Sequence, residues 1–195
     1  MQEKELKIIL EKKQYIDLIN TLSISYEAKI KYQENYYFDT LNYDYLKSKE
    51  MLRVRKTKEK TILTIKRNSS VKDGYFECEE IEKSFEKCVW NDKNLLRFIF
   101  DRDQTFIKNL DFVNLGCLKN LRTIFQTKDF KLEIDQSNFT KSQIHYELEC
   151  ETIDPEKLLD FLDNEGLLQK KQIIFQTESK FKRFLKYNIK NLNIF

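Results

Sequence analysis

Short segments in which charged and apolar side chains alternate constrain the fold of this chain more than any other feature. The pattern covers residues 2–10 and returns in residues 26–40 and 74–85. Successive side chains of a β-strand point to opposite faces, so the alternation predicts half-buried strands. Because the chain has only 3 glycines and 1 proline in 195 residues, periodicity must set the boundaries of these strands.

Further strands are predicted in both halves of the chain. Residues 51–57 and 61–67 flank the polar sequence KEK and form a hairpin candidate. Residues 117–127, 130–139 and 144–153 resume the alternation after Gly116. The sum is seven or eight strands, mostly joined without a βαβ repeat. This order favours an antiparallel α+β fold in one domain over residues 1–195.

Helical spacing separates the groups of strands. Residues 11–22 predict a helix, residues 41–50 a turn or short helix, and residues 85–114 one or two helices. Asp154 and Pro155 form a good N-cap and first position for a helix that ends near Gly166. The remaining segment, residues 176–189, fits either a strand or a helix.

Composition excludes several classes of protein. With 41% hydrophobic and 34% charged residues, the chain has enough apolar content for a core. A net charge of +3 is too small to indicate nucleic acid or a membrane as a partner. Four scattered cysteines and one histidine predict reduced thiols and no zinc set. No apolar run approaches the ~20 residues of a membrane span, so we expect a soluble cytoplasmic protein.

The polar faces of the predicted strands carry full charges that segregate by strand. Two interpretations stay open on the residues alone: the solvated face of an ordinary sheet, or the lumen of a closed barrel. A lumen lined with like charges needs compensation, which a polyphosphate with a divalent metal supplies. The same-face acids are Glu3, Glu5, Glu77, Glu79, Glu147, Glu149 and Glu151, and the same-face bases are Arg53, Arg55, Lys66 and Lys131.

Eight short motifs resemble those of one known family in their order and approximate spacing. Together they cover nearly the whole chain, which resembles the CYTH superfamily of triphosphate tunnel metalloenzymes. Residues 85–114 carry no motif that matches. The motifs are EKELK (3–7), NYYFDT (35–40), LRVR (52–55), LTIKR (63–67), FECEE (76–80), LEIDQSNF (132–139), YELECE (146–151) and SKFKRF (179–184).

The resemblance implies a closed antiparallel eight-stranded barrel with a charged lumen and helices packed outside. It implies metal ligation by Glu3, Glu5, Glu147 and Glu149, with Glu151 as a further ligand. Glu77 and Glu79 could hold a second metal or fix basic side chains, and Tyr37 with Lys66 matches a catalytic pair of some members. The implied phosphate-binding set is Lys7, Arg53, Arg55, Lys66, Arg122, Lys180 and Arg183.

The expected function is metal-dependent hydrolysis of a small triphosphate, with inorganic tripolyphosphate as substrate and Mg²⁺ or Mn²⁺ as cofactor. Three alternatives remain: a class IV-like adenylate cyclase, a thiamine triphosphatase, or a polyphosphate-binding module without turnover. Paired carboxylates argue against the last, because they would repel phosphate in the absence of metal. The residues leave the organic part of the substrate, the preferred metal and the oligomeric state open.

Overall fold

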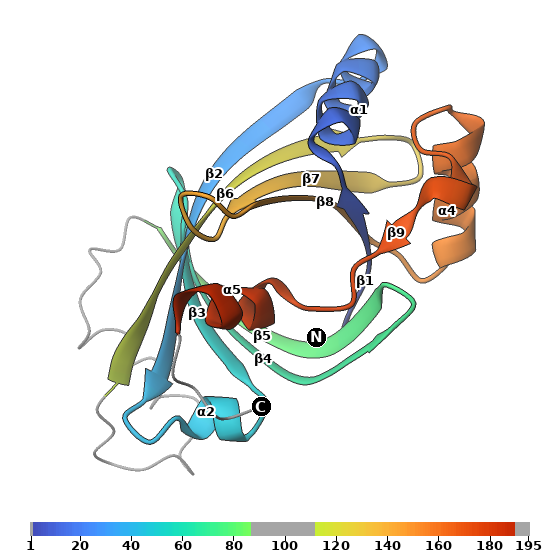
Figure 1. Cartoon of the computed structure of the whole chain (residues 1–195). Helices are drawn as coiled ribbons and strands as arrows, with labels where there is room; N and C mark the ends of the chain where they lie inside the picture. The colour runs from blue at the N-terminus through green and yellow to red at the C-terminus, as the bar shows by residue number, and fades with distance from the viewer. Residues whose placement is uncertain (1, 87–111, 190–195) are drawn as a thin grey trace.

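The computed structural model describes residues 2–86 and 112–189 (Figure 1). Eight of the strands in this part of the chain form one closed antiparallel barrel, and a short ninth strand pairs beside it. The strands are β1 (Gln2–Leu10), β2 (Ala28–Thr40), β3 (Met51–Lys56), β4 (Lys60–Lys72), β5 (Tyr75–Glu86), β6 (Phe112–Gln126), β7 (Lys131–Asn138), β8 (Ile144–Glu151) and β9 (Ile174–Phe175).

The first strand closes the barrel. The sheet runs β5-β4-β3-β2-β6-β7-β8-β1, and β1 pairs again with β5. The amino-terminal half of β1 lies against β5, with Glu3 opposite Cys78, and its carboxyl-terminal half lies against β8, with Lys7 opposite Glu149. Closure gives the strands an inner and an outer face, so it separates two sets of alternating side chains. The predicted eight-stranded α+β barrel is confirmed.

Each predicted strand corresponds to one of β1–β8, but both boundaries of the segment predicted as helical differ. The hairpin of residues 51–67 is the β3–β4 pair. The helical interpretation of residues 85–114 falls mostly on residues 87–111, which lie outside the described residues. Its ends are wrong, because residues 85–86 belong to β5 and residues 112–114 begin β6. Apolar residues with helical spacing can therefore also lie at the end of one strand and at the start of the next.

The helices begin where the sequence places caps. Asp154 accepts a hydrogen bond from the backbone N–H of Lys157 at 3.1 Å, and Gly166 follows the helix at φ 64°. Ser179 caps the last helix in the same way, which settles residues 180–188 as helical. The helices are α1 (Lys12–Ser25), α2 (Asp44–Lys47), α4 (Pro155–Asn164), α5 (Lys180–Asn188) and the 3₁₀ turn η1 (Lys170–Gln172).

The largest apolar core lies outside the barrel. Helices α1 and α4 bury the outer faces of β1, β7 and β8, where Leu6, Ile8, Ile134 and Leu148 are at most 2% exposed. Figure 1 shows both helices outside the ring of strands. Burial of these side chains stabilises the fold by ~1.5–3 kcal/mol each. The barrel therefore does not need an apolar interior.

Helix α5 lies across one end of the barrel (Figure 1). Phe184 and Leu185 pack there against Tyr37, Leu118 and other apolar side chains of the strand ends. Gly116, at φ 127°, lets the Phe184 ring approach, because a Cβ at this position would lie 2.9 Å from its Cζ atom. This end is apolar and covered. Within the described residues, no helix is long and apolar enough to cross a membrane.

Candidate active site

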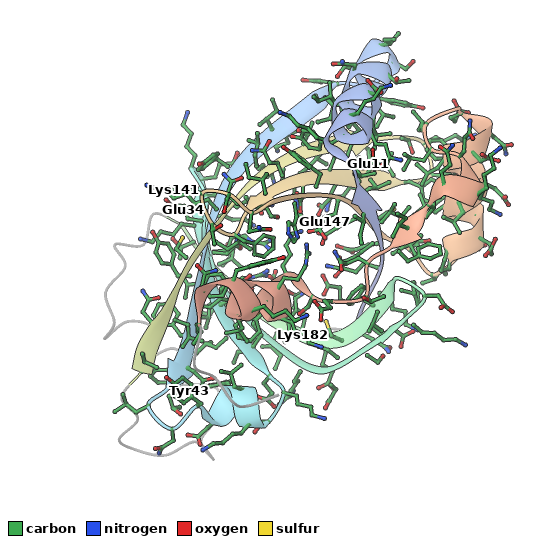
Figure 2. All side chains as sticks on the ribbon, viewed as in Figure 1. Glu11, Glu34, Tyr43, Lys141, Glu147 and Lys182 are labelled. Carbon is green, nitrogen blue, oxygen red and sulfur yellow. The ribbon has the colours of Figure 1, made fainter. Side chains whose placement is uncertain are left out.

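The register of the barrel decides which charged residues share its interior. Lys7 of β1 lies opposite Glu149 of β8, which in turn lies opposite Glu133 of β7. In the β6–β7 pair, Arg122 lies opposite Asp135. Residues directly opposite each other in a sheet point to the same face. Figure 2 shows Glu147 inside the ring of strands, whereas Glu11 and Lys141 lie outside it. The lumen is therefore lined with charged side chains.

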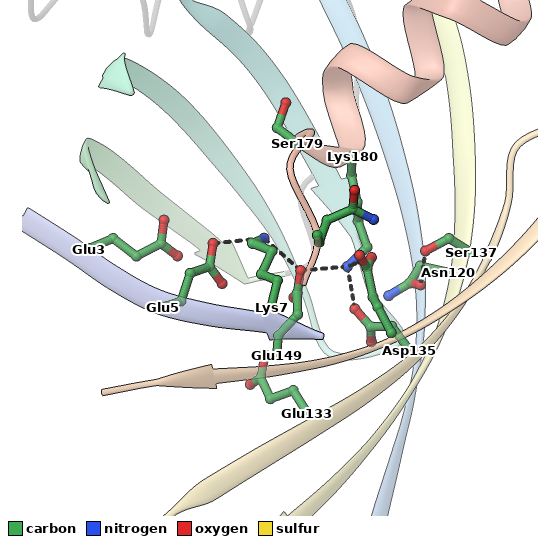
Figure 3. A network of polar contacts seen from close by, with 12 residues as sticks. Glu3, Glu5, Lys7, Asn120, Glu133, Asp135, Ser137, Glu149, Ser179 and Lys180 are labelled. Atoms are coloured by element: carbon green, nitrogen blue, oxygen red, sulfur yellow. Dashed lines mark hydrogen bonds and ion pairs between the residues drawn. The ribbon is translucent and has the colours of Figure 1, made fainter. Parts of the chain in front are cut away.

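Three buried carboxylates form a cluster in this lumen. Asp135, Glu147 and Glu149 each offer one oxygen, and these oxygens all lie within 4.8 Å of one another. They are 0%, 0% and 4% exposed. Such burial would keep an isolated carboxylate neutral. Cations from three directions instead hold the pKa values of Asp135 and Glu149 below their usual range (Figure 3).

The first cation is Lys7 of β1. Its Nζ lies 2.6 Å from Glu149 Oε1 and 2.8 Å from Glu5 Oε1. Burial alone would lower the pKa of Lys7, but Glu149 and Glu5 raise it above its usual range. Lys7 therefore stays charged and links the EKELK carboxylates to the buried cluster.

The second cation is Arg122 of β6. Its guanidinium donates to Asp135 through Nε at 2.8 Å and Nη2 at 2.6 Å, and it also contacts Glu133 and Glu149. Although burial opposes charge, Lys180, Lys7 and Arg122 hold the pKa of Glu149 well below its usual range. The bidentate geometry matches the planar fork of arginine to a carboxylate.

The third group of cations comes from α5. Lys180 Nζ lies 2.5 Å from Asp135 Oδ2 and 2.9 Å from Glu149 Oε1, and Arg183 Nη2 lies 2.7 Å from Glu147 Oε2. Arg183 also contacts Nδ1 of His145 at 3.1 Å. The one-turn spacing of Lys180 and Arg183 places both on one side of the helix. Helix α5 thus covers the barrel end and contributes charge to the lumen.

The opposite side of the lumen carries arginines with mostly neutral partners. Arg55 donates from Nε to Asn35 Oδ1 at 2.9 Å, and Arg53 donates from Nη2 to Thr64 Oγ1 at 3.0 Å. Two glutamates, Glu80 and Glu82, lie 3.6 Å from Arg53. The buried Nε of Arg53 has no hydrogen-bond partner. Burial, then Arg53 and Arg122, lower the pKa of Arg55 to about 9, and among the described residues no carboxylate forms an ion pair with Arg55.

Lys66 lies between the two sides of the lumen. It contacts Glu3 directly, and its Nζ is 3.4 Å from Glu80 Oε1. Although burial would lower the pKa of Lys66, Glu5 and Glu3 raise it. Burial raises the pKa of Glu80 to about 7, against the effect of Lys66. The lumen therefore contains one carboxylate that titrates near neutral pH.

Three predicted metal ligands lie away from this cluster. Glu77 and Glu79 are on the outer face of β5, where they pair with Lys4 at 3.0 Å and with Arg67 at 2.9 Å. The register explains this placement, because Cys78, and not its neighbours, lies opposite Glu3, and pairing with basic side chains is one of the two roles expected for Glu77 and Glu79. Glu151 is exposed at the end of β8. The structure brings the other predicted metal ligands and the predicted cations into the lumen.

The structure adds residues that the sequence interpretation did not assign. Asp135 and Glu80 are the most important of these residues. They lie in the motifs LEIDQSNF and FECEE, but no role was expected for either of them. Parity could have found them: Asp135 lies two residues after Glu133, and Glu80 lies on the same face as Cys78. Neutral partners such as Asn35 and Thr64 carry no charge signal in the sequence, and only the register identifies them.

Tyr37 lies in the lumen but is packed by α5. It is 2% exposed, and its ring lies 4.8 Å from the ring centroids of both Phe181 and Phe184. Burial raises the pKa of Tyr37, so its hydroxyl stays protonated at neutral pH. Both Tyr37 and Lys66 are among the described residues, and no hydrogen bond joins them.

The donor set fits a hard divalent cation. Carboxylate oxygens are the ligands that Mg²⁺ and Mn²⁺ prefer. Glu147 Oε1 is buried without a hydrogen bond, although Lys180 Nζ lies 2.7 Å away in an orientation that makes none. An oxygen that is buried and not hydrogen-bonded is a natural ligand atom. Asp135, Glu147 and Glu149 are therefore the residues best placed to hold a metal, with Glu3 and Glu5 beside them.

Known structures share this fold. The chain is similar to the protein HpAC1 from Hippeastrum, with a TM-score of 0.77 and 24% identity over 98% of this chain and 99% of that one. It is also similar to a Bacillus halodurans protein (TM-score 0.62, 22% identity, 93% and 96% covered) and to PH1819 from Pyrococcus horikoshii (TM-score 0.61, 16% identity, 95% and 99% covered). No curated protein sequence matches the chain.

A family model gives the assignment. The model of the CYTH domain matches residues 1–185, which include every strand of the barrel and most of α5. The match agrees with the motifs, with the closed barrel and with the charged lumen. The chain therefore belongs to the CYTH domain family.

Proposed function

We propose that this protein is a metal-dependent triphosphatase that hydrolyses inorganic tripolyphosphate to phosphate and diphosphate. One observation carries the proposal: the lumen places arginines with mostly neutral partners opposite a buried cluster of carboxylates. A phosphate chain would supply an anion to Arg55, which forms no ion pair with the described residues, and a closer one to Arg53, whose nearest carboxylate oxygens are 3.6 Å away. A divalent cation would relieve the repulsion between that chain and the carboxylates.

The phosphate-binding groups are the lumenal cations. Arg53 and Arg55 bind phosphate oxygens with guanidinium donors that now contact neutral side chains. Lys66 extends this surface beside Glu3, whereas Arg122 is already held by Asp135. Asp135, Glu147 and Glu149 would hold Mg²⁺ or Mn²⁺, which neutralises charge that develops on the phosphate oxygens.

Hydrolysis also needs a group that accepts a proton from the attacking water. A proton acceptor works best when its pKa lies near the working pH. Burial raises the pKa of Glu80 to about 7, so Glu80 meets this condition. It lies beside Lys66, whose Nζ is 3.4 Å away. The water oxygen attacks the terminal phosphorus, and the bond from that phosphorus to its bridging oxygen breaks. The proton passes to the carboxylate and then to solvent.

A nucleotide cyclase is the second candidate. Two of the similar structures, those from Hippeastrum and Bacillus halodurans, are described as adenylate cyclase candidates, and the Hippeastrum protein is described as having a dominant triphosphatase activity. A cyclase needs a pocket for the base and ribose. Charged, amide and hydroxyl side chains line much of the lumen, and Tyr37 is packed by α5. Hydrolysis of tripolyphosphate needs no pocket for a base or a ribose.

Product analysis tests the proposal. The purified protein would be incubated with tripolyphosphate, ATP and thiamine triphosphate, each with and without Mg²⁺ or Mn²⁺, and phosphate, diphosphate and cyclic AMP would be measured. We expect metal-dependent release of phosphate and diphosphate from tripolyphosphate. Cyclic AMP as the main product would establish the cyclase. Binding of all three compounds without turnover under any metal would establish a binding module.

The Glu5→Gln variant tests the metal site with a small change in shape. Because Glu5 lies beside Lys7 and the buried cluster, we expect loss of turnover together with a weaker metal dependence. Glu79→Gln is the matched control, since it removes the same charge from the outer face of the barrel. Equal activity of the two variants would contradict the assignment of the lumen as the site.

A further inference from the structure

Lys180 reaches from α5 into the buried carboxylate cluster. Its Nζ lies 2.5 Å from Asp135 Oδ2, 2.7 Å from Glu147 Oε1 and 2.9 Å from Glu149 Oε1. Figure 3 shows this side chain at the start of α5, beside Asp135 and Glu149. One ammonium group thus contacts all three carboxylates that are best placed to hold a metal.

The other oxygen of each carboxylate is held by an arginine. Arg122 donates from Nε to Asp135 Oδ1 at 2.8 Å, and it contacts Glu149 Oε2. Arg183 Nη2 lies 2.7 Å from Glu147 Oε2. A metal ion that binds all three carboxylates can therefore leave these arginine contacts in place only if it takes the oxygens on the side of the ammonium.

Glu147 Oε1 shows that the ammonium satisfies this site only in part. Lys180 donates hydrogen bonds to Asp135 and Glu149. Within the described part of the chain, the buried Glu147 Oε1 makes no hydrogen bond, although the ammonium lies 2.7 Å away. A divalent cation collects several oxygens around one centre and needs no donor direction. The three oxygens therefore suit a metal ion better than an ammonium group.

Lys180 is the cation of this cluster that can most easily withdraw. A lysine carries a point charge on a flexible stem, whereas the fork of an arginine is fixed by paired contacts. The Lys180 side chain is 15% exposed, and that of Arg183 is 5% exposed and packs on the Phe139 ring at 5.1 Å. Phe184 and Leu185 hold α5 against the barrel. Withdrawal of the lysine side chain therefore does not require the helix to leave.

A divalent cation that enters the cluster meets a charged competitor. Although burial would lower the pKa of Lys180, the carboxylates of Asp135, Glu147 and Glu149 raise it, so the side chain stays charged. Like charges a few ångströms apart repel strongly in a buried site. The ammonium and a metal ion therefore cannot occupy the same group of oxygens.

We propose that Lys180 competes with the metal: its ammonium neutralises the carboxylate cluster in the metal-free protein and leaves the cluster when a divalent cation binds. This inference rests on the proposed function, whose metal site Lys180 would regulate. One cation replaces another, and no covalent bond changes. The exchange keeps the buried carboxylates paired in both states, and it lowers the affinity of the protein for the metal.

Direct binding of Mn²⁺ to the Lys180→Met variant tests the competition. Methionine is unbranched like lysine, carries no charge and offers no oxygen ligand. Titration calorimetry at about pH 8, well above ordinary carboxyl pKa values, would measure the Kd in the absence of any phosphate compound. We expect Lys180→Met to bind Mn²⁺ at least about tenfold more tightly than the wild type, because no ion pair has to be broken. Equal or weaker binding would overturn the proposal.

Two further variants serve as controls. Lys182→Met removes the same charge from an exposed position of α5, where Lys182 lies 3.5 Å from Glu178. Its Kd for Mn²⁺ should stay within about twofold of the wild-type value. Lys180→Arg keeps the cation and should bind Mn²⁺ no more tightly than the wild type. An equal gain in Lys180→Met and Lys182→Met would show only a general effect of charge and would overturn the competition.

A measurement on the unaltered protein keeps the proposal testable if Lys180→Met does not fold. An amine-acylating reagent should label the buried Lys180 slowly in the metal-free protein. Saturating Mn²⁺ should increase this labelling, as measured by mass spectrometry, while the labelling of exposed Lys182 and Lys186 stays the same. Unchanged labelling of Lys180 would show that the ammonium stays in the cluster and would overturn the proposal.

Hydrolysis and metal competition can fail separately. Mn²⁺-dependent hydrolysis of tripolyphosphate with equal Kd values for the wild type and Lys180→Met would keep the proposed function and overturn the competition. Tighter Mn²⁺ binding by Lys180→Met in a protein that hydrolyses no phosphate compound would support the competition and overturn the proposed function. If neither protein binds Mn²⁺, the competition is overturned.

Discussion

The two sides of the lumen hold their cations in opposite ways. On the β7–β8 side, Arg122 and Lys180 are neutralised by buried carboxylates at 2.5–2.8 Å. On the β3 side, Arg53 and Arg55 contact a hydroxyl and an amide, and carboxylates come no closer than 3.6 Å. Arginine therefore forms buried ion pairs on one side of the lumen, whereas its hydrogen bonds on the other side go to neutral side chains.

This difference separates structural from functional charge. A buried pair that is already neutralised gains little from an added anion, because the anion must compete with carboxylates. An arginine with a neutral partner gains a charge-assisted bond and loses repulsion from its neighbours. The β3 side is therefore the better candidate site for phosphate, and the β7–β8 side is the better candidate site for a metal. Four experiments with five substitutions, taken in order of expected effect, examine this division.

The largest effect is expected from Glu149→Gln. This change removes a buried charge that contacts Lys7, Arg122 and Lys180 at once. Breaking a buried pair costs about 3–5 kcal/mol of the free energy of unfolding. Turnover should fall at least about 100-fold through loss of a metal ligand and of its supporting network. Thermal unfolding and a Mg²⁺ titration of activity measure both, with exposed Glu151→Gln as the control on the same strand.

Arg122→Gln and Arg55→Gln should differ most clearly in their effects on stability. Arg122→Gln should lower the free energy of unfolding by about 3 kcal/mol, because it leaves Asp135 buried without its bidentate partner. Arg55→Gln removes a cation that its surroundings disfavour, so stability should stay equal or rise. The KM for tripolyphosphate should still rise about tenfold in this variant. Equal destabilisation of both variants in denaturant titrations would remove the distinction between the two sides.

Glu80→Gln gives a pH-dependent effect on stability. The pKa of Glu80 is about 7 in the fold, above its ordinary value of 4.5. A raised carboxyl pKa stabilises the fold below the ordinary value, and this contribution is lost as pH rises through 7. The variant should therefore match the wild type near pH 4.5 and become more stable relative to it by about 1–3 kcal/mol at pH 8. Urea unfolding at both pH values measures this difference, and its absence would place Glu80 in a solvated environment.

The smallest effect is expected from Glu77→Gln. Glu77 pairs with Lys4 on the outer face at 3.0 Å, where both side chains are about one-third exposed. Exposed pairs of this kind contribute little to the free energy of unfolding, because solvent screens the charges. Metal dependence and KM should be unchanged. A loss of activity comparable to that of Glu5→Gln would mean that β5 presents its other face to the substrate.

Much of this arrangement could be predicted from the alternation alone. The parity of Glu3, Glu5 and Lys7 on β1 is correct, because a nine-residue strand with a clear pattern fixes its own faces. The alternation did not identify the inward face of β5, because FECEE places glutamates on both faces. Only the pairing with β1 decides which set faces inward. Asp135 was missed for a similar reason. LEIDQSNF holds two acids, Glu133 and Asp135, and Asp135 gains its role only from its contacts with Arg122 and Lys180.

The double pairing of β1 has a consequence for how this chain folds. The strand that closes the barrel is the first to be made, yet one of its partners, β8, lies more than 130 residues later in the chain. Loop closure over such a separation is costly in entropy, and proteins rich in such contacts fold slowly. During synthesis the edge of β1 that pairs with β8 stays unpaired until β8 is made, whereas its edge toward β5 can pair earlier. Its charged face then acts as protection, because Glu3, Glu5 and Lys7 discourage pairing with other exposed strands until β8 emerges.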